Sequence, residues 1–163
     1  FFGEAECATC HNGPALANNE FHAIGMNDLE GGNVVNTPDA PVAAKGRGGF
    51  TGNPEDDYKF KVPQLYNLKD SPFYGHGASF QSVRDLVAYK NSALPENPNV
   101  TENQLSEHFQ PLNLTEEEIN DIANFIENGL YDPDLMRYAP VSLPTGNCFP
   151  NNDGQSQQDL GCN

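Results

Sequence analysis

The residues best suited to chemistry lie in the run Cys7-Ala8-Thr9-Cys10-His11. Two cysteines separated by two residues and followed directly by a histidine form the attachment sequence of a c-type haem. The two thiols form thioether bonds with the porphyrin, and the adjacent imidazole is the proximal ligand of the iron. The spacing therefore predicts one covalently bound haem c, held by Cys7, Cys10 and His11.

The same residues allow two other interpretations, a redox-active dithiol and half of a zinc site. A thioredoxin-like dithiol lies near a βαβ pattern, which this sequence does not show. A zinc site needs a second pair of ligands, and the other two cysteines, Cys148 and Cys162, are too far apart in sequence to form that pair. Haem attachment is therefore the preferred interpretation.

The charge of the chain limits its partners. The 163 residues carry a formal charge of -15, which argues against binding to nucleic acid or to an anionic membrane surface. It favours a redox partner protein with a basic docking face, such as a small basic cytochrome. A need for solubility explains the same charge equally well.

Cysteine chemistry indicates the compartment. We find no apolar run long enough to span a membrane and no signal peptide. Haem attachment, together with a predicted Cys148–Cys162 disulfide, requires an oxidising location, periplasmic or extracellular. Only six residues precede the haem motif, so we expect the chain to be a mature form or a fragment that starts within a longer protein.

Two segments have clear helical patterns. A helix is predicted from Ser79 or Ser82 to about Asn91, because apolar residues recur there at helical spacing. Its stripe consists of Val83, Leu86, Val87 and Lys90.

A second helix is predicted to begin at a capping box formed by Thr115 and Glu118. It ends near Gly129. Its apolar face consists of Ile119, Ile122, Ile126 and Leu130.

The rest of the sequence favours irregular structure. We expect a short helix over residues 1–11, mostly loop over 12–60 and an extended or turn segment over 60–68, where Pro63 argues against a central strand. With no convincing sheet, the predicted fold is mainly α, with long loops around a cytochrome c-like haem domain at 1–135. Residues 136–163 are expected to form an extended tail closed by the disulfide.

Several further segments follow the haem motif in a recognisable order. They are CATCHNGP at 7–14, FHAIG at 21–25, KGR at 45–47, FTG at 50–52, YKFKVPQLYN at 58–67, SPFYGHG at 71–77 and LNLTEEE at 112–118. Together they resemble the C-terminal haem domain of the bacterial di-haem cytochrome c peroxidases and their MauG-type relatives. The resemblance covers roughly residues 1–130.

The resemblance implies a cytochrome c-like α fold and an electron-transfer role. In these peroxidases the C-terminal haem passes electrons from a donor to a second haem in another domain, where peroxide is reduced. This chain has one haem motif, so the implied function is electron transfer within a di-haem peroxidase-like oxidoreductase. The second haem domain would belong to the same or another chain. The alternative is a haem with an open or labile sixth site, acting directly as a peroxidase or MauG-like oxidase.

The sixth iron ligand separates these two functions. The family position held by methionine in the peroxidases and by tyrosine in MauG-type proteins corresponds to Lys90, which also shares the apolar stripe of its helix. A neutral lysine amine is a competent ligand, although a structural role near the helix end, with the amine reaching water or a propionate, is the more common one for a lysine. The other possibilities are Met26, Tyr89, His76 or no protein ligand.

Other residues have weaker signals. Met136, His22 and His108 are better explained by packing, a structural hydrogen bond and a surface loop. Arg47 and Lys45 lie in a glycine-rich loop and are candidates for pairing with haem propionates. The resemblance also implies a Ca²⁺ ion near the segment of Asp70, whose carboxylate is a suitable hard ligand.

Overall fold

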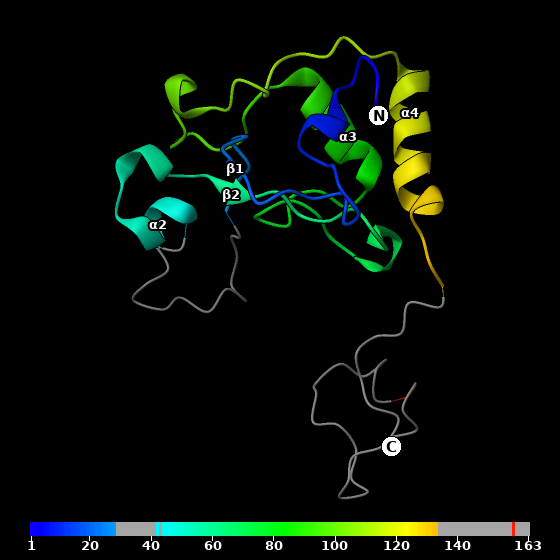
Figure 1. The fold of residues 1–163 in the computed structure, drawn as a ribbon. Coiled ribbons are helices and arrows are strands. Elements are labelled where there is room, and N and C mark those ends of the chain that lie inside the picture. Colours follow the sequence, from blue (N-terminus) through cyan, green and yellow to red (C-terminus); the bar gives the residue numbers. More distant parts are fainter. Residues whose placement is uncertain (29–41, 43, 134–157, 159–163) are drawn as a thin grey trace, which may run out of the picture. The chain divides into compact units, whose positions relative to one another are not determined.

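The computed structural model describes residues 1–28, 42, 44–133 and 158. The chain divides into two compact units, Phe1–Tyr131 and Asp132–Asn163, and the described elements belong to the first (Figure 1). Among the described residues, no helix is both long enough and apolar enough to span a bilayer. The predicted Cys148–Cys162 disulfide and Met136 lie outside the described residues, as does the tail apart from residue 158.

The first predicted helix is confirmed as α3, Val83–Ser92. Its N-cap is Ser82, whose side chain accepts a hydrogen bond from the Asp85 N–H at 3.0 Å. This bond satisfies one of the backbone donors that a helix leaves unpaired at its start. Ser82, rather than Ser79, therefore fixes the beginning of α3.

The second predicted helix is confirmed as α4, Glu116–Asn124, and it continues as the π-helical turn η5, Phe125–Gly129. The capping box is present: the Glu118 N–H donates to the Thr115 hydroxyl at 3.3 Å, and the Thr115 N–H donates to the Glu118 carboxylate at 2.8 Å. These bonds from Thr115 hold the pKa of Glu118 below its usual value. The stability that Glu118 contributes is therefore present above its unfolded pKa and is lost as the pH falls through its folded pKa.

Helices α3 and α4 pack against each other (Figure 1). Their contact is one apolar cluster, which also receives Ala5 from the N-terminal segment and, more peripherally, Cys7. Its buried members are Ala5, Val83, Ile122, Ala123 and Ile126. Because Cys7 borders this cluster, the two helices hold the start of the haem motif.

A second apolar cluster also includes residues of α3. Tyr89 packs there against Phe80 and Phe109, with ring centroids 5.0 Å and 5.4 Å from its own. This cluster joins α3 to the long segment that leads to α4.

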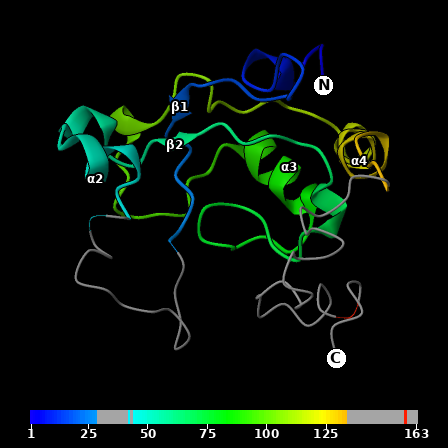
Figure 2. The same cartoon turned by 60° about the horizontal axis from the view of Figure 1, so that its bottom comes forward.

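The expectation of no sheet was wrong, because the described residues include a small two-stranded sheet. Strand β1, Phe21–His22, pairs antiparallel with β2, Phe60–Lys61, and the pair lies between α2 and α3 (Figure 2). The extended conformation expected over 60–68 is therefore present at β2.

Other short elements complete the unit. Helix α2, Arg47–Thr51, lies in a region predicted to be mostly loop, and the short helix expected over residues 1–11 is limited to the 3₁₀ turn η1, Cys7–Thr9. Glu6 has a left-handed backbone (φ 49°), which prevents one helix from running through the segment. The remaining 3₁₀ turns are η2, Pro54–Asp56; η3, Leu68–Asp70; and η4, Glu102–Gln104.

Replacing Thr115 with alanine should test the cap of α4. Loss of the hydroxyl leaves the Glu118 N–H without its acceptor, so the free energy of unfolding should fall by about 1 kcal/mol. Urea denaturation followed by circular dichroism measures this change. Thr115→Ser keeps the hydroxyl and should retain most of the stability. Equal stability of the alanine and serine variants would show that the cap contributes nothing.

Candidate haem site

The haem motif begins in the tight turn η1. The backbone N–H groups of His11 and Cys10 both donate to the Cys7 carbonyl, at 2.9 Å and 3.3 Å. This turn brings the three residues of the motif together within five positions of the chain. Cys7 and Cys10 are both free thiols and both partly buried.

The imidazole of His11 is oriented by the loop that follows it. Its Nδ1 lies 3.1 Å from the carbonyl oxygen of Leu16. A carbonyl only accepts hydrogen bonds, so Nδ1 carries the proton and Nε2 carries the lone pair. This is the tautomer that a metal-binding histidine needs when its other nitrogen is held by a carbonyl.

Burial supports the same protonation state. It lowers the pKa of His11, against the opposing hydrogen bonds to the carbonyls of Leu16 and Pro63. The neutral imidazole is therefore favoured at neutral pH, and only a neutral imidazole can bind a metal.

Burial also affects the pKa of the two thiols. It raises the pKa of Cys7 and of Cys10, and the nearby charge of Glu20 raises that of Cys10 further. Both thiols are thus kept protonated at neutral pH rather than as reactive thiolates. Two unpaired thiols beside a neutral, oriented imidazole fit the donor set that a c-type haem needs.

The charge of Lys90 partly opposes the rise in the pKa of both thiols. Lys90 lies in the last turn of α3, half buried, and burial lowers its pKa. Interactions with Cys7, Cys10 and Glu6 partly oppose that shift. Its Nζ donates a hydrogen bond to the backbone carbonyl of His108 and lies 5.4 Å from the ring centroid of Phe109.

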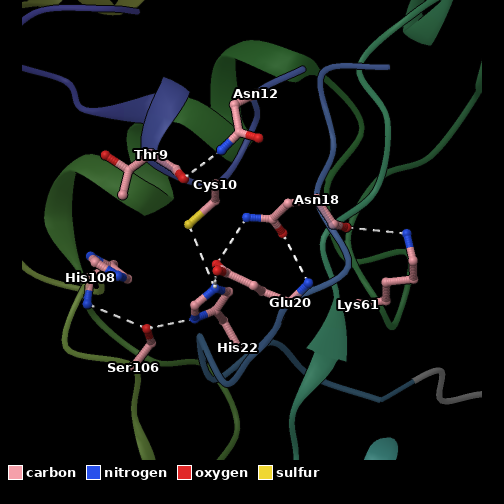
Figure 3. A network of polar contacts seen from close by, with 9 residues as sticks. All are labelled: Thr9, Cys10, Asn12, Asn18, Glu20, His22, Lys61, Ser106 and His108. Carbon is pink, nitrogen blue, oxygen red and sulfur yellow. Dashed lines mark hydrogen bonds and ion pairs between the residues drawn. The ribbon is translucent and has the colours of Figure 1, made fainter. Parts of the chain in front are cut away.

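A polar network surrounds Cys10 (Figure 3). The Nε2 atom of His22 lies 3.7 Å from Cys10 Sγ and 3.3 Å from Glu20 Oε2, while its Nδ1 lies 3.0 Å from the hydroxyl of Ser106. The ring of His108 is T-shaped to that of His22, at 5.5 Å. The hydrogen-bonded role expected for His22 agrees with these contacts, and His108 is an exposed loop residue as expected.

Cys10, Glu20 and His22 also form a possible metal group, since one ligand atom from each lies within 4.8 Å of the other two. This grouping competes with haem attachment, because a thioether sulfur is no longer available as a thiolate ligand. Among the described residues it is the sole such group of three, and Asp70, the residue expected near Ca²⁺, is not part of it.

Three of the other candidate ligands have partners elsewhere. The Tyr89 hydroxyl donates to the Ile24 carbonyl at 2.5 Å, and burial raises its pKa to about 12. The Met26 sulfur accepts the backbone N–H of His76 at 3.4 Å. The Nε2 atom of His76 lies 2.7 Å from a carboxylate oxygen of Asp28, and the His76 ring stacks on the ring of Phe60.

The two basic residues of the glycine-rich loop form ion pairs. Arg47 lies 3.3 Å from Asp56 and 4.4 Å above the ring of Phe21, and Lys45 lies 2.8 Å from Asp57. Phe21 precedes His22 in β1, so Arg47 is joined to the network around Cys10 through that strand. The pairing of Arg47 with a haem propionate stays a prediction.

Sequence reasoning missed Glu20 and Ser106. Ser106 is 84 residues from His22 in the chain, and its N–H donates to the Ala23 carbonyl at 2.8 Å. A serine in a polar loop has no local signal for such a contact. Glu20 could have been noticed only from its position two residues before His22.

The fold and the motif together define a mainly α haem domain of the cytochrome c type. Its fold is similar to that of a MauG-like protein associated with microbial copper homeostasis, with a TM-score of 0.66, 24% identity, and coverage of 84% of this chain and 46% of that one. No family model matches the chain.

The chain is similar in sequence to curated cytochrome c peroxidases and to MauG. The chain is 29% identical over 145 residues to cytochrome-c peroxidase IdrP1 of Denitromonas iodatirespirans, covering 78% of this chain and 37% of the relative. It is 26% identical over 147 residues to the methylamine utilization protein MauG of Methylorubrum extorquens, covering 88% of this chain and 35% of the relative. Cytochrome c551 peroxidase of Pseudomonas aeruginosa is 30% identical to the chain over 95 residues, covering 56% of this chain and 25% of the relative.

The chain is thus homologous to the bacterial cytochrome c peroxidases and MauG, and the family resemblance seen in the sequence is confirmed. These relatives support a haem oxidoreductase. The chain spans at most 37% of the length of the three curated relatives described here.

Proposed function

We propose that this chain is a c-type cytochrome domain that carries one covalently bound haem and transfers electrons within a di-haem peroxidase-like oxidoreductase. Cys7 and Cys10 would anchor the haem, and His11 would be the proximal ligand. The bound haem supplies one-electron redox chemistry. The observation that carries this proposal is the His11 imidazole, neutral and held by Leu16, directly beside two free thiols.

The chain's residues orient the proposed proximal ligand. The Leu16 carbonyl fixes the ring of His11. The Tyr66 hydroxyl donates to the Pro14 carbonyl at 3.0 Å, which anchors the loop between His11 and Leu16. A ring held in one orientation limits the rearrangement that accompanies a change of redox state. Such rigidity suits electron transfer.

The proposed partners follow from the charge of the chain and from its similarity to part of longer relatives. With a formal charge of -15, the chain would attract a donor protein with a basic face, such as a small basic cytochrome. The second haem would lie in another domain of the same or another chain. Covalent haem attachment and the predicted Cys148–Cys162 disulfide favour a periplasmic or extracellular location.

A second function is favoured by one observation. Lys90 Nζ donates its hydrogen bond to the His108 carbonyl, and if it stays there in the haem-loaded chain the sixth iron position is open. An open position admits peroxide and other small ligands. The chain would then act directly as a peroxidase or a MauG-like oxidase.

Absorption spectroscopy of the haem-loaded chain, combined with intact mass and a peroxide assay, should decide between the two functions. The electron-transfer domain should carry one haem, be low-spin in both oxidation states and consume no peroxide. A high-spin ferric haem with peroxide turnover would replace this proposal with the second. A mass equal to the bare polypeptide would reject both.

A further inference from the structure

Three side chains with different metal-binding groups face one another beside the haem motif (Figure 3). The Sγ atom of Cys10 lies 3.7 Å from Nε2 of His22, and the same nitrogen lies 3.3 Å from Oε2 of Glu20. One ligand atom from each residue lies within 4.8 Å of the other two. A thiol, an imidazole and a carboxylate therefore converge on one small volume.

The separations of these atoms match a tetrahedral zinc ion. Zinc binds sulfur at about 2.3 Å, and it binds nitrogen or carboxylate oxygen at about 2.0–2.2 Å. Tetrahedral angles then place sulfur and nitrogen about 3.6 Å apart, and nitrogen and oxygen about 3.4 Å apart. The observed 3.7 Å and 3.3 Å each differ from these values by about 0.1 Å. A zinc ion would fit between the three atoms with little rearrangement.

The fold holds the imidazole in place from its far side. His22 belongs to β1, which pairs with β2, and its Nδ1 atom lies 3.0 Å from the hydroxyl of Ser106. Ser106 is fixed in turn, because its N–H donates to the Ala23 carbonyl at 2.8 Å. With a cation on Nε2, Nδ1 carries the proton and donates it to the Ser106 hydroxyl. Such an outer contact is typical of metal-bound histidines.

The carboxylate and the thiol are also positioned by local contacts. The Asn18 side-chain amide donates to Oε2 of Glu20 at 2.9 Å, and its Oδ1 accepts the Glu20 N–H at 3.0 Å. Cys10 is set by the turn η1, where its N–H donates to the Cys7 carbonyl at 3.3 Å. All three ligands are therefore arranged before any metal arrives.

Charge and access favour a divalent cation at this group. The Glu20 side chain is 62% exposed and that of His22 is 21% exposed, so an ion can enter from solvent. A thiolate and a carboxylate together neutralise a doubly charged ion, and water would complete the tetrahedron. The formal charge of -15 attracts cations to the chain as a whole.

We propose that the haem-free chain binds one Zn²⁺ ion through Cys10, Glu20 and His22, and that zinc and haem exclude each other at Cys10. On binding, the thiol gives its proton to water and its sulfur forms a bond to zinc, and no electron is transferred. A thioether sulfur has no proton to give and is not a thiolate ligand. The zinc site itself does not rest on the proposed function, whereas the mutual exclusion does.

Zinc titration of the full chain without haem tests the site, with the thiols kept reduced and a chromophoric chelator as competitor. We expect one zinc ion per chain. Cys10→Ser and His22→Gln should each weaken binding at least about 100-fold, because the loss of an outer contact alone costs about 10–100-fold. Glu20→Gln should weaken it at least about tenfold. Glu4→Gln is the matched control, because Glu4 is exposed and outside the group, and it should bind zinc as the parent does.

Cobalt(II) in place of zinc identifies the ligands directly. A tetrahedral site with a thiolate should give strong visible bands and a sulfur-to-metal charge-transfer band in the near ultraviolet. Both should be absent from Cys10→Ser. Cys7→Ser should keep them, which separates this site from one formed by the two thiols of the haem motif. The haem-loaded chain should bind zinc at least about 100-fold more weakly than the haem-free chain.

Two outcomes would overturn the proposed zinc site and leave the proposed function intact. One is a haem-free chain that binds no stoichiometric zinc. The other is an equal loss of affinity in Cys7→Ser and Cys10→Ser, which would assign the metal to the two thiols. Undiminished zinc affinity in the haem-loaded chain would reject the mutual exclusion. A chain that binds zinc as expected but never carries haem would reject the proposed function and leave the zinc site standing.

Discussion

Replacing both Cys7 and Cys10 with serine should yield a colourless polypeptide with the mass of the bare chain. Serine hydroxyls do not form the thioether bonds that attach a c-type haem. Without the thioether bonds the cofactor would be held by coordinate bonds alone, in a chain whose apolar content is only 37%. Intact mass and a pyridine haemochrome spectrum after denaturation measure the loss, which should be complete.

Thr9→Ala is the matched control for this change. Thr9 lies between the two cysteines and is exposed, and its backbone carbonyl, rather than its side chain, accepts the hydrogen bond from Asn12 at 2.9 Å. Removal of its hydroxyl should leave one haem per chain. Covalent haem retained by the double serine variant would contradict the assignment of Cys7 and Cys10 as anchors.

The parts of the structure that depend on local chemistry could be predicted from sequence. The capping box at Thr115 and Glu118 is set by residues three apart, and the existence of α3 follows from its helical repeat. Its predicted stripe is divided in the structure, because Val83 and Val87 pack in the first cluster and Leu86 packs in the second. The haem motif is local as well, since all three of its residues lie within one turn. In each case the interacting groups are near neighbours in the chain, so their spacing determines their contact.

The parts that depend on distant contacts could not be predicted. The pairing of β1 with β2 joins residues about forty positions apart, and two-residue strands leave no alternating pattern to detect. The π-helical turn η5 carries no sequence signal that separates it from α4. Tertiary packing decides these features, and packing is not encoded in any short window.

The candidate site divides in the same way. Cys7, Cys10 and His11 were identified by their spacing, whereas the contact of His22 with Ser106 depends on a long loop returning to β1. Sequence placed Lys90 on an apolar stripe, but only the structure shows its hydrogen bond to the His108 carbonyl. Whether the sixth iron position is open therefore depends on whether Lys90 keeps that hydrogen bond in the haem-loaded chain.

Replacing Ile122 with alanine should cause the largest loss of stability that leaves the haem motif unchanged. Ile122 belongs to the buried cluster that joins α4 to Val83 of α3 and to Ala5. Its truncation removes apolar contacts and leaves a cavity, at a cost of about 3 kcal/mol. Since small domains have only about 5–15 kcal/mol of stability, this is a large fraction.

Urea denaturation of the haem-loaded chain, followed by circular dichroism, should show a lower midpoint with an unchanged slope. Glu117→Ala is the matched control on the same helix, because Glu117 is exposed. It should change the stability by less than about 1 kcal/mol. If Ile122→Ala were as stable as this control, the α3–α4 contact would not support the domain. The site would then have to be held in place by the haem itself, because Cys7 borders that cluster and Lys90 lies on α3.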